Sequence, residues 1–186
     1  MPAPPSAPTS TADHPHGHEA PEGPVQATVA LEPNDRARLG LPALPGTAID
    51  PAALPPLDED QWADPEVVAA RLVRVRTNYR ADDDPETLRL PSSPYVVPRF
   101  DAELASSSGG QAGLGQLQAQ DTVFAGDVVG LVTSERSDNR SVVDLTVRRS
   151  TARRGTLVSA QVSFWRVTLV REPASGHWQV AGLELS

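Results

Sequence analysis

The sequence predicts an α+β fold in which helices pack on a strongly curved antiparallel sheet, preceded by a disordered Pro-rich N-terminal tail. Two observations predict the folded part. An amphipathic helical pattern covers residues 64 to 80, and alternating β-branched segments joined by short turns follow residue 124. Helices followed by a run of antiparallel strands are typical of the α+β class. The tail is predicted by proline, because thirteen of the 19 prolines lie before residue 61.

Composition divides the 186-residue chain into three parts. Residues 1 to 24 hold almost no large apolar side chain, so burial cannot offset the entropy of ordering them, and we expect a disordered Pro- and His-rich tail. Residues 25 to 60 carry leucines between prolines that prevent regular hydrogen bonding, which favours an extended Pro-rich arm laid on a domain surface. Residues 61 to 186 are expected to form one α+β domain with a single core.

Charge and cysteine content exclude several classes of function. The net charge is −8 and all 16 basic residues are arginine, so we expect a bacterial protein without a nucleic-acid partner. Cysteine is absent, which removes disulfides, thiol catalysis and thiolate metal sites. No run of 18 apolar residues is present, so a membrane is expected to be reached only through an anchor absent from this chain.

The first long element is a helix predicted from residue 64 to residue 80. Asp64 suits the N-cap, Pro65 the first helical position and Glu66 the positive end of the helix dipole. Apolar residues then recur with helical spacing while arginines occupy the other face, so one face is expected to pack on the core. These apolar residues are Val68, Leu72, Val75 and Tyr79. A second, shorter helix is predicted from residue 98 to residue 105.

Four strands are predicted in the C-terminal half. They cover residues 128 to 132, 142 to 147 and 157 to 170, and a last strand that begins near residue 178. Turn residues separate them, and the arginine-rich segment from residue 148 to residue 154 is expected at a hairpin tip.

The strand from residue 157 to residue 170 carries an unusual pattern. Its apolar side chains occupy one parity up to Phe164 and the other parity from Trp165 onward. We interpret this change as a β-bulge that bends the strand so that both apolar sets meet one curved core. Phe164, Trp165 and Trp178 are therefore expected in the core, and Gly182 predicts a second bulge in the last strand.

The helix DPEVVAARLVRVRTNY and the ending FWRVTLVREPASGHWQVAGLEL resemble the nuclear transport factor 2-like superfamily, also described as SnoaL-like or cystatin-like, over residues 64 to 186. The resemblance implies a cone-shaped domain in which a curved sheet wraps around helices. Within the superfamily the chain is most similar to extracytoplasmic domains of Gram-positive conjugation proteins of the TcpC kind and to actinobacterial Mce-associated proteins. Members of both branches are normally anchored by a transmembrane helix ahead of the domain.

This resemblance implies a non-enzymatic assembly or interaction domain of a bacterial cell-envelope machine, with a conjugation (type IV secretion) apparatus as the expected machine. It implies an extracytoplasmic location and protein partners from the same assembly, and it leaves self-association open. The alternative within the superfamily is a SnoaL-like small-molecule enzyme or binder with a pocket between the helix and the sheet. Because this fold occurs in both kinds of protein, the two functions have to be distinguished by the residues of the candidate site.

Four arginines form the densest basic patch and are the candidate partner-binding residues: Arg148, Arg149, Arg153 and Arg154. A guanidinium group binds carboxylates or phosphates through two parallel hydrogen bonds, which suits an acidic partner. The second interpretation is structural, since charge at a hairpin also keeps a sheet edge from pairing with other chains.

The remaining polar candidates form no recognisable catalytic constellation, so we expect no catalytic residue, no cofactor and no metal site in the folded part. His14, His16 and His18 alternate in the tail, a spacing that either binds a divalent metal or is simply solvated. His177 has the opposite parity to Trp178 and is expected at a solvated strand edge. The other candidates for a pocket are Asp144, Tyr79 and Tyr95, and Trp62 is expected as a hydrophobic staple or an exposed anchor.

Removal of residues 1 to 24 is expected to leave the melting temperature of the protein almost unchanged, because a segment without apolar side chains contributes no core. Differential scanning calorimetry of the full and shortened chains measures this. A drop of several degrees would show that the tail is part of the folded structure.

Overall fold

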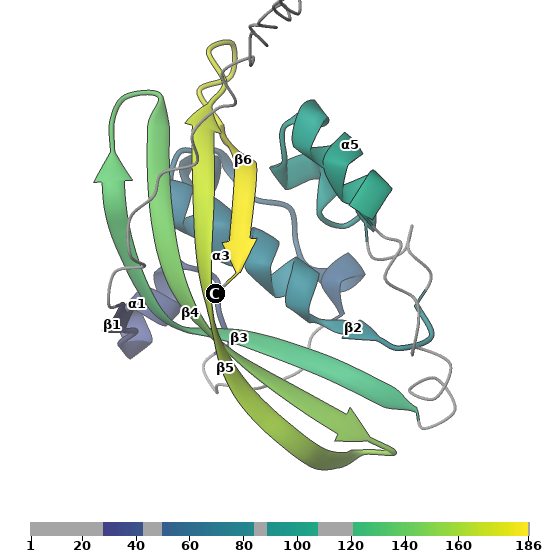
Figure 1. Cartoon of the computed structure of the whole chain (residues 1–186). Coiled ribbons are helices and arrows are strands. Elements are labelled where there is room, and N and C mark those ends of the chain that lie inside the picture. The colour runs from purple at the N-terminus through teal and green to yellow at the C-terminus, as the bar shows by residue number, and fades with distance from the viewer. Residues whose placement is uncertain (1–27, 43–49, 84–88, 108–120, 186) are drawn as a thin grey trace, which may run out of the picture.

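The structure, a computed structural model, describes residues 28–42, 50–83, 89–107 and 121–185, so the predicted tail lies outside it. These residues form an α+β domain in which helices cover one face of a strongly twisted antiparallel sheet (Figure 1). The predicted fold class is confirmed. The helical segments are α1 (Pro33–Arg38), η1 (Pro51–Ala53), α2 (Glu59–Trp62), α3 (Pro65–Thr77), η2 (Ser93–Tyr95) and α5 (Pro98–Ser107). The strands are β1 (Val29–Ala30), β2 (Tyr79–Arg80), β3 (Thr122–Arg136), β4 (Arg140–Arg153), β5 (Thr156–Arg171) and β6 (Trp178–Leu185).

The sheet has the order β1-β3-β4-β5-β6, and β2 pairs with the start of β3. Strands β3, β4, β5 and β6 follow one another as a meander of hairpins, which is the connection expected for short turns. The predicted strands at 128–132 and 142–147 are the central parts of the much longer β3 and β4. The polar residues at both ends of β4 also belong to the strand, because their backbone groups pair with β3 on one side and β5 on the other.

Helix α3 begins as predicted, with Asp64 accepting a hydrogen bond from the backbone N–H of Glu66. It ends at Thr77 rather than at residue 80, because the side chain of Asn78 donates to the carbonyl oxygens of both Arg74 and Gly126. The chain then becomes extended, so Tyr79 lies in β2 instead of on the helical stripe.

The core lies between α3 and the inner face of the sheet. Leu72 of α3 and Val143 of β4 are fully buried there, and Trp165 is 5% exposed. Trp178, which the sequence also predicts in the core, is 3% exposed. Helix α5, predicted at 98–105, packs beside β6 through Phe100 and completes this layer (Figure 1).

The central strands are far longer than the helix that covers them. Helix α3 has 13 residues, a length of roughly 20 Å. Strand β5 has 16 residues, a length of roughly 50 Å. One half of the sheet therefore extends beyond α3, as the lower part of Figure 1 shows. We refer to residues 148–164, the outer halves of β4 and β5 with their turn, as the distal ribbon.

The interpretation of a mid-strand bulge in β5 is wrong. The register between β4 and β5 runs without a shift from Ala160 to Val170, and the irregularity lies near Val158 instead. Phe164 consequently lies on the outer face of the sheet and is 43% exposed. The alternate apolar residues of β5 from Trp165 onward face the core, whereas those up to Phe164 are exposed to solvent. The second predicted bulge is confirmed, because the register between β5 and β6 shifts next to Gly182.

The described parts of the Pro-rich arm, residues 28–42 and 50–60, pack on the domain, and Leu39, Leu41 and Leu57 are buried in its core. The arm is not extended throughout, because it contains α1 and α2. Helix α2 has a reciprocal capping box between Asp58 and Gln61. The helix has only four residues, so it shows no helical periodicity in the sequence, and the capping box is its only local signal.

Trp165→Ala is expected to lower the free energy of unfolding by about 3 to 5 kcal/mol, because it empties a buried site of an aromatic side chain. Its neighbour supplies the matched control: Phe164→Ala removes an exposed ring and should change stability by less than about 1 kcal/mol. Urea unfolding of both variants measures the difference. Equal losses would contradict the register of β5.

Candidate functional site

The four predicted arginines lie on the distal ribbon but do not form one patch. Arg149 pairs with Gln161 on the inner face, whereas Arg148 pairs with Val162 on the outer face. Arg153 ends β4, and Arg154 lies in the turn with a φ of 48°. Within the described residues, none of the four makes a salt bridge. The ribbon therefore presents unneutralised positive charge on both of its faces.

An open hollow of about 360 Å³ lies on the inner face of the distal ribbon. It combines two arginines with neutral hydrogen-bonding side chains and one aromatic ring. The lining residues are Phe124, Arg149, Thr151, Arg153, Val158, Ser159 and Gln161. Such a lining suits an anionic group, because two guanidinium groups and several hydroxyl or amide donors converge without a carboxylate between them.

The aromatic ring that lines this hollow, Phe124, belongs to a stacked pair. Tyr79 of β2 stacks on Phe124 of β3 with ring centroids 4.6 Å apart. The Tyr79 hydroxyl accepts a hydrogen bond of 3.5 Å from Arg149, which directs that side chain across the inner face. Because Tyr79 reaches this place only by leaving α3 early, the end of the helix determines the shape of the site.

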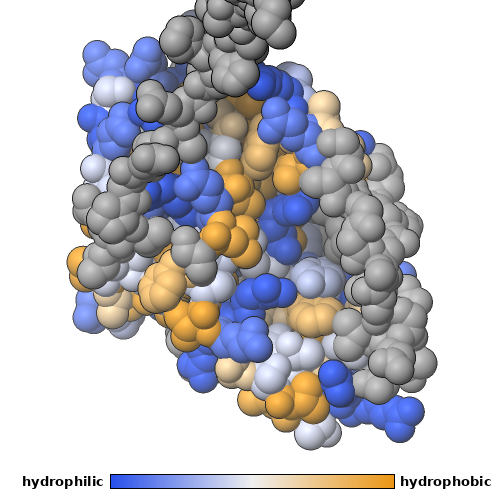
Figure 2. Space-filling model, viewed as in Figure 1, coloured by the Kyte–Doolittle hydropathy of each residue, from blue (hydrophilic) through white to orange (hydrophobic). Residues whose placement is uncertain are grey.

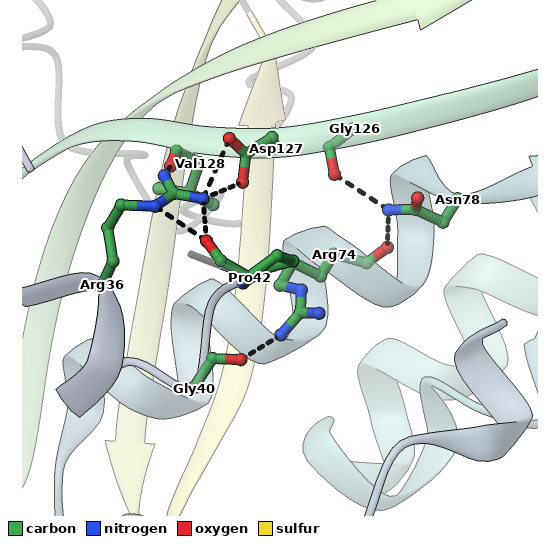
Figure 3. Close-up of polar contacts among 8 residues, drawn as sticks. All are labelled: Arg36, Gly40, Pro42, Arg74, Asn78, Gly126, Asp127 and Val128. Atoms are coloured by element: carbon green, nitrogen blue, oxygen red, sulfur yellow. Dashed lines mark hydrogen bonds and ion pairs between the residues drawn. The ribbon is translucent and has the colours of Figure 1, made fainter. Parts of the chain in front are cut away.

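Gly126 allows the end of α3 to approach the sheet closely. A Cβ atom at this position would lie 2.0 Å from Thr77 Oγ1, so no other residue fits without displacement. Thr77 in turn donates its hydroxyl to the carbonyl oxygen of Val73 and is 1% exposed. Asn78 donates to the Gly126 carbonyl oxygen at 2.9 Å (Figure 3). These contacts place β2, and with it Tyr79, against β3.

A buried cluster of charged residues holds the arm beside the same part of β3 (Figure 3). Arg36 donates to both carboxylate oxygens of Asp127, at 2.9 and 3.1 Å, and to the carbonyl oxygens of Pro42 and Val128. Arg74 donates to the carbonyl oxygen of Gly40. Burial, followed by repulsion from a neighbouring arginine, lowers the pKa of Arg74 to about 10. The cluster thus holds the arm through one ion pair, between Arg36 and Asp127, and through hydrogen bonds to the carbonyl oxygens of Gly40, Pro42 and Val128.

The other polar candidates serve the fold. His177 stacks on Trp62 with centroids 5.2 Å apart, and its Nε2 lies 3.0 Å from a carboxylate oxygen of Glu59. Trp62 also stacks on Tyr95, with ring centroids 5.5 Å apart, so its partners are aromatic rings of η2 and of the residue before β6. It is a partly buried neighbour of the core. His177 is thus half-buried in this ring stack rather than a freely solvated strand-edge residue.

Asp144, the remaining acidic candidate, is completely buried on the outer side of β4. It accepts two hydrogen bonds from Arg166, at 2.8 and 3.1 Å. These hydrogen bonds raise the pKa of the Arg166 guanidinium. The pair lies across the sheet from the core, so Asp144 does not point into the space between α3 and the sheet.

Two kinds of feature are absent from residues 28–42, 50–83, 89–107 and 121–185. No cluster of three or more histidine, aspartate or glutamate side chains there is arranged to hold a metal ion. No helix there is both long and apolar enough to span a membrane. His14, His16 and His18 lie outside the described residues.

Comparison with known proteins gives a likeness in fold. No family model matches the chain, and no curated protein matches it in sequence. An IcmL-like type IV secretion system protein from Legionella pneumophila superposes with a TM-score of 0.53 at 9% identity, over 71% of this chain and 94% of that one. A periplasmic fragment of TraM superposes with a TM-score of 0.52 at 10% identity, over 70% and 98%. Both structures share the α+β architecture described here.

The sequence identifies the arginines but not their surroundings. Phe124 lines the hollow and Tyr79 stacks on it, whereas the apolar spacing of the sequence predicts Tyr79 on a helical face. The signal that identifies its true place is Asn78, a residue that favours helix ends over helix interiors. Ser159 and Gln161 carried a signal too, because polar residues on the core parity of a strand indicate a face that the core does not cover.

Gly126→Ala is expected to destabilise the protein by about 1 to 3 kcal/mol, because the new methyl group overlaps Thr77. Thr77→Ala in the same chain should recover only a small part of that loss, because it removes Oγ1 but leaves the Thr77 Cβ atom, which would lie 2.2 Å from the new methyl group. Gly182→Ala is the matched control, because its Cβ would meet Thr168 at an ordinary 3.7 Å. Chemical denaturation of the variants measures these differences, and a neutral Gly126→Ala would contradict the close approach.

Proposed function

We propose that this protein is a non-enzymatic assembly domain of a bacterial cell-envelope machine of the type IV secretion kind, and that it works outside the cytoplasm. The observation that carries the proposal is the fold, which is shared with a type IV secretion system protein and with a periplasmic fragment. A domain of this kind acts by binding other proteins of the machine.

The packing of the core supports a binding role over the enzymatic alternative. An enzyme of this fold would hold its substrate between α3 and the sheet. That space is filled by Val68, Leu72, Leu145 and Val167, each fully buried, and by Trp165. Among the described residues, the candidate polar side chains lie outside this space: Asp144 is paired with Arg166, and His177 lies beside Glu59. The surface of the domain is therefore the part available for recognition.

The distal ribbon is the docking surface in this proposal. Residues 148–164 carry a charge of +4 in a chain of net charge −8, so the rest of the chain carries −12. A basic projection on an acidic body orients an approaching acidic partner and accelerates its association. Arg149 and Arg153 line the hollow and are the residues assigned to contact that partner.

The finer assignments belong to the same proposal. Kinship with the TcpC-like conjugation proteins or the actinobacterial Mce-associated proteins rests on the helix from residue 64 and the ending from residue 164. The partners are proteins of the envelope assembly, and the membrane is reached through an anchor supplied outside this chain.

Deletion of the gene in its bacterial host is expected to abolish transfer of the secretion substrate, with full recovery on complementation by the wild-type gene. Complementation by a double variant, Arg149→Glu with Arg153→Glu, should restore transfer poorly, because reversed charge repels an acidic partner. The measured quantities are the transfer frequency and the amount of protein in the envelope fraction.

Arg136→Glu is the control for the change in charge. Arg136 is exposed at the opposite end of β3, so this variant should complement like the wild type. Normal transfer in the deletion strain would overturn the proposed function as a whole. Normal transfer by the double variant alone would overturn the docking role of the ribbon.

A further inference from the structure

Half of β5 has an unpaired backbone edge. Strand β6 covers β5 only as far as Trp165, which pairs with Leu185. Among the described residues, no strand lies beside Thr156 to Phe164 on that side, although the other side is paired with β4 throughout. A strand of this length with a free edge is a template for an added strand.

The polar groups that face this free edge follow from the hydrogen-bond pattern. Arg171 donates its N–H to Asn139 on the β4 side, and Glu172 donates to His177 on the β6 side. Residues of an antiparallel strand alternate between its two neighbours. Between the irregularity near Val158 and the end of β5, even-numbered residues therefore direct their N–H and C=O groups toward the β6 side. Below Trp165 these are Phe164, at the point where β6 ends, and then Ala160 and Val162, beside which no strand of the described residues lies.

The opposite edge of the sheet is treated differently. Along β3, the carbonyl oxygens of residues 122, 126, 128 and 129 each accept a hydrogen bond from the arm or from the segment after α3. Strands β1 and β2 pair with the same edge. This edge is thus covered from Thr122 to Leu131. Among the described residues the edge of β5 from Thr156 to Phe164 has no such cover, so the two edges of the sheet differ.

The side chains of the open segment lack the usual protection of an exposed edge. Residues 156 to 164 contain no charged residue and no proline, the features that normally prevent strand addition. Val162 is 59% exposed and Phe164 is 43% exposed, both on the outer face. Figure 2 shows hydrophobic and strongly hydrophilic side chains together on this projecting part of the molecule. The added strand gains apolar contacts on that face.

The inner face of the neighbouring strand β4 is basic, because Arg149 and Arg153 lie there. Ser159 and Gln161 of β5 are uncharged and line the same hollow as these two arginines. To meet an added strand, Arg149 exchanges its 3.5 Å hydrogen bond to Tyr79 for one to an acidic side chain. A strand beside β5 lies two strand spacings from β4, roughly 10 Å, a gap that an arginine and a glutamate side chain span together. Side chains of the added strand that point inward therefore meet positive charge.

We propose that β5 binds an extended segment of a partner protein as an additional strand, with apolar and acidic side chains alternating along that segment. Its apolar side chains pack beside Val162 and Phe164, and its acidic side chains meet Arg149 and Arg153. This inference rests on the proposed function, which it deepens by naming the docking mode and the chemistry of the partner. A second copy of this chain fits less well, because it brings the same four arginines to the junction.

The test uses the full chain and a fluorescein-labelled decapeptide in which glutamate alternates with valine. Fluorescence anisotropy should show saturable binding, and a decapeptide alternating lysine with valine should not bind. Ala160→Pro removes an N–H from the free edge without removing a bond to β4, so it should weaken binding about tenfold. Ala160→Ser keeps that N–H and should bind like the wild type.

Hydrogen exchange measured by NMR supplies a readout that needs no variant. In the free protein the amides of Ala160 and Val162 should exchange quickly and those of Gln161 and Ser163 slowly. The glutamate–valine peptide should protect the first two. Absence of that protection, or equal binding by Ala160→Pro and Ala160→Ser, would overturn strand addition while leaving the proposed function standing.

Sedimentation velocity of the chain without peptide tests whether a second copy of the chain, rather than a partner protein, occupies the free edge of β5. A monomer is the expected result. A dimer that Ala160→Pro converts into a monomer would show that a second copy occupies the edge, and it would overturn the assignment of an acidic partner. Loss of peptide binding in the Arg149→Glu, Arg153→Glu double variant, with binding retained in Arg136→Glu, is the expected result for charge recognition.

Discussion

The difference in length between the helix and the strands determines the organisation of this protein. Strands β3, β4 and β5 span 14 to 16 residues, whereas α3 spans 13 residues with less than half the rise per residue. The helix therefore covers only one half of the sheet, and that half contains the apolar core. The other half keeps its hydrogen-bonded ladder, and none of the described helices lies over it. Stability and recognition are in this way placed at opposite ends of the same strands.

The boundary between the two halves is built with close contacts. Gly126 admits Thr77 against the sheet, Asn78 ends α3, and the stacked Tyr79 begins the uncovered region. The Arg36–Asp127 pair secures the arm at the same level of β3. Breaking a buried ion pair of this kind leaves an uncompensated charge, so the arm and the sheet are coupled to one another. The distal ribbon projects from this boundary as a basic extension of an acidic body.

Local patterns in the chain were sufficient for much of the fold. Asp64 and Pro65 predict the start of α3, and the alternation of apolar residues from Trp165 onward identifies the buried half of β5. Gly182 identifies the bulge beside β6. The error at Phe164 has a physical reason, since alternation reports which residues share a face and does not report whether that face is covered.

By itself the sequence determined the α+β class, the limits of α3 and α5 to within a few residues, the buried tryptophans and the concentration of arginine at 148–154. These properties depend on neighbours along the chain, which local periodicity and capping describe. Only the tertiary structure decided that Arg148 and Arg149 face opposite sides, that Tyr79 lies under Arg149, and that β6 stops at Trp165 and leaves an edge open. Each of these depends on where distant segments end relative to one another, and packing in three dimensions sets that relation.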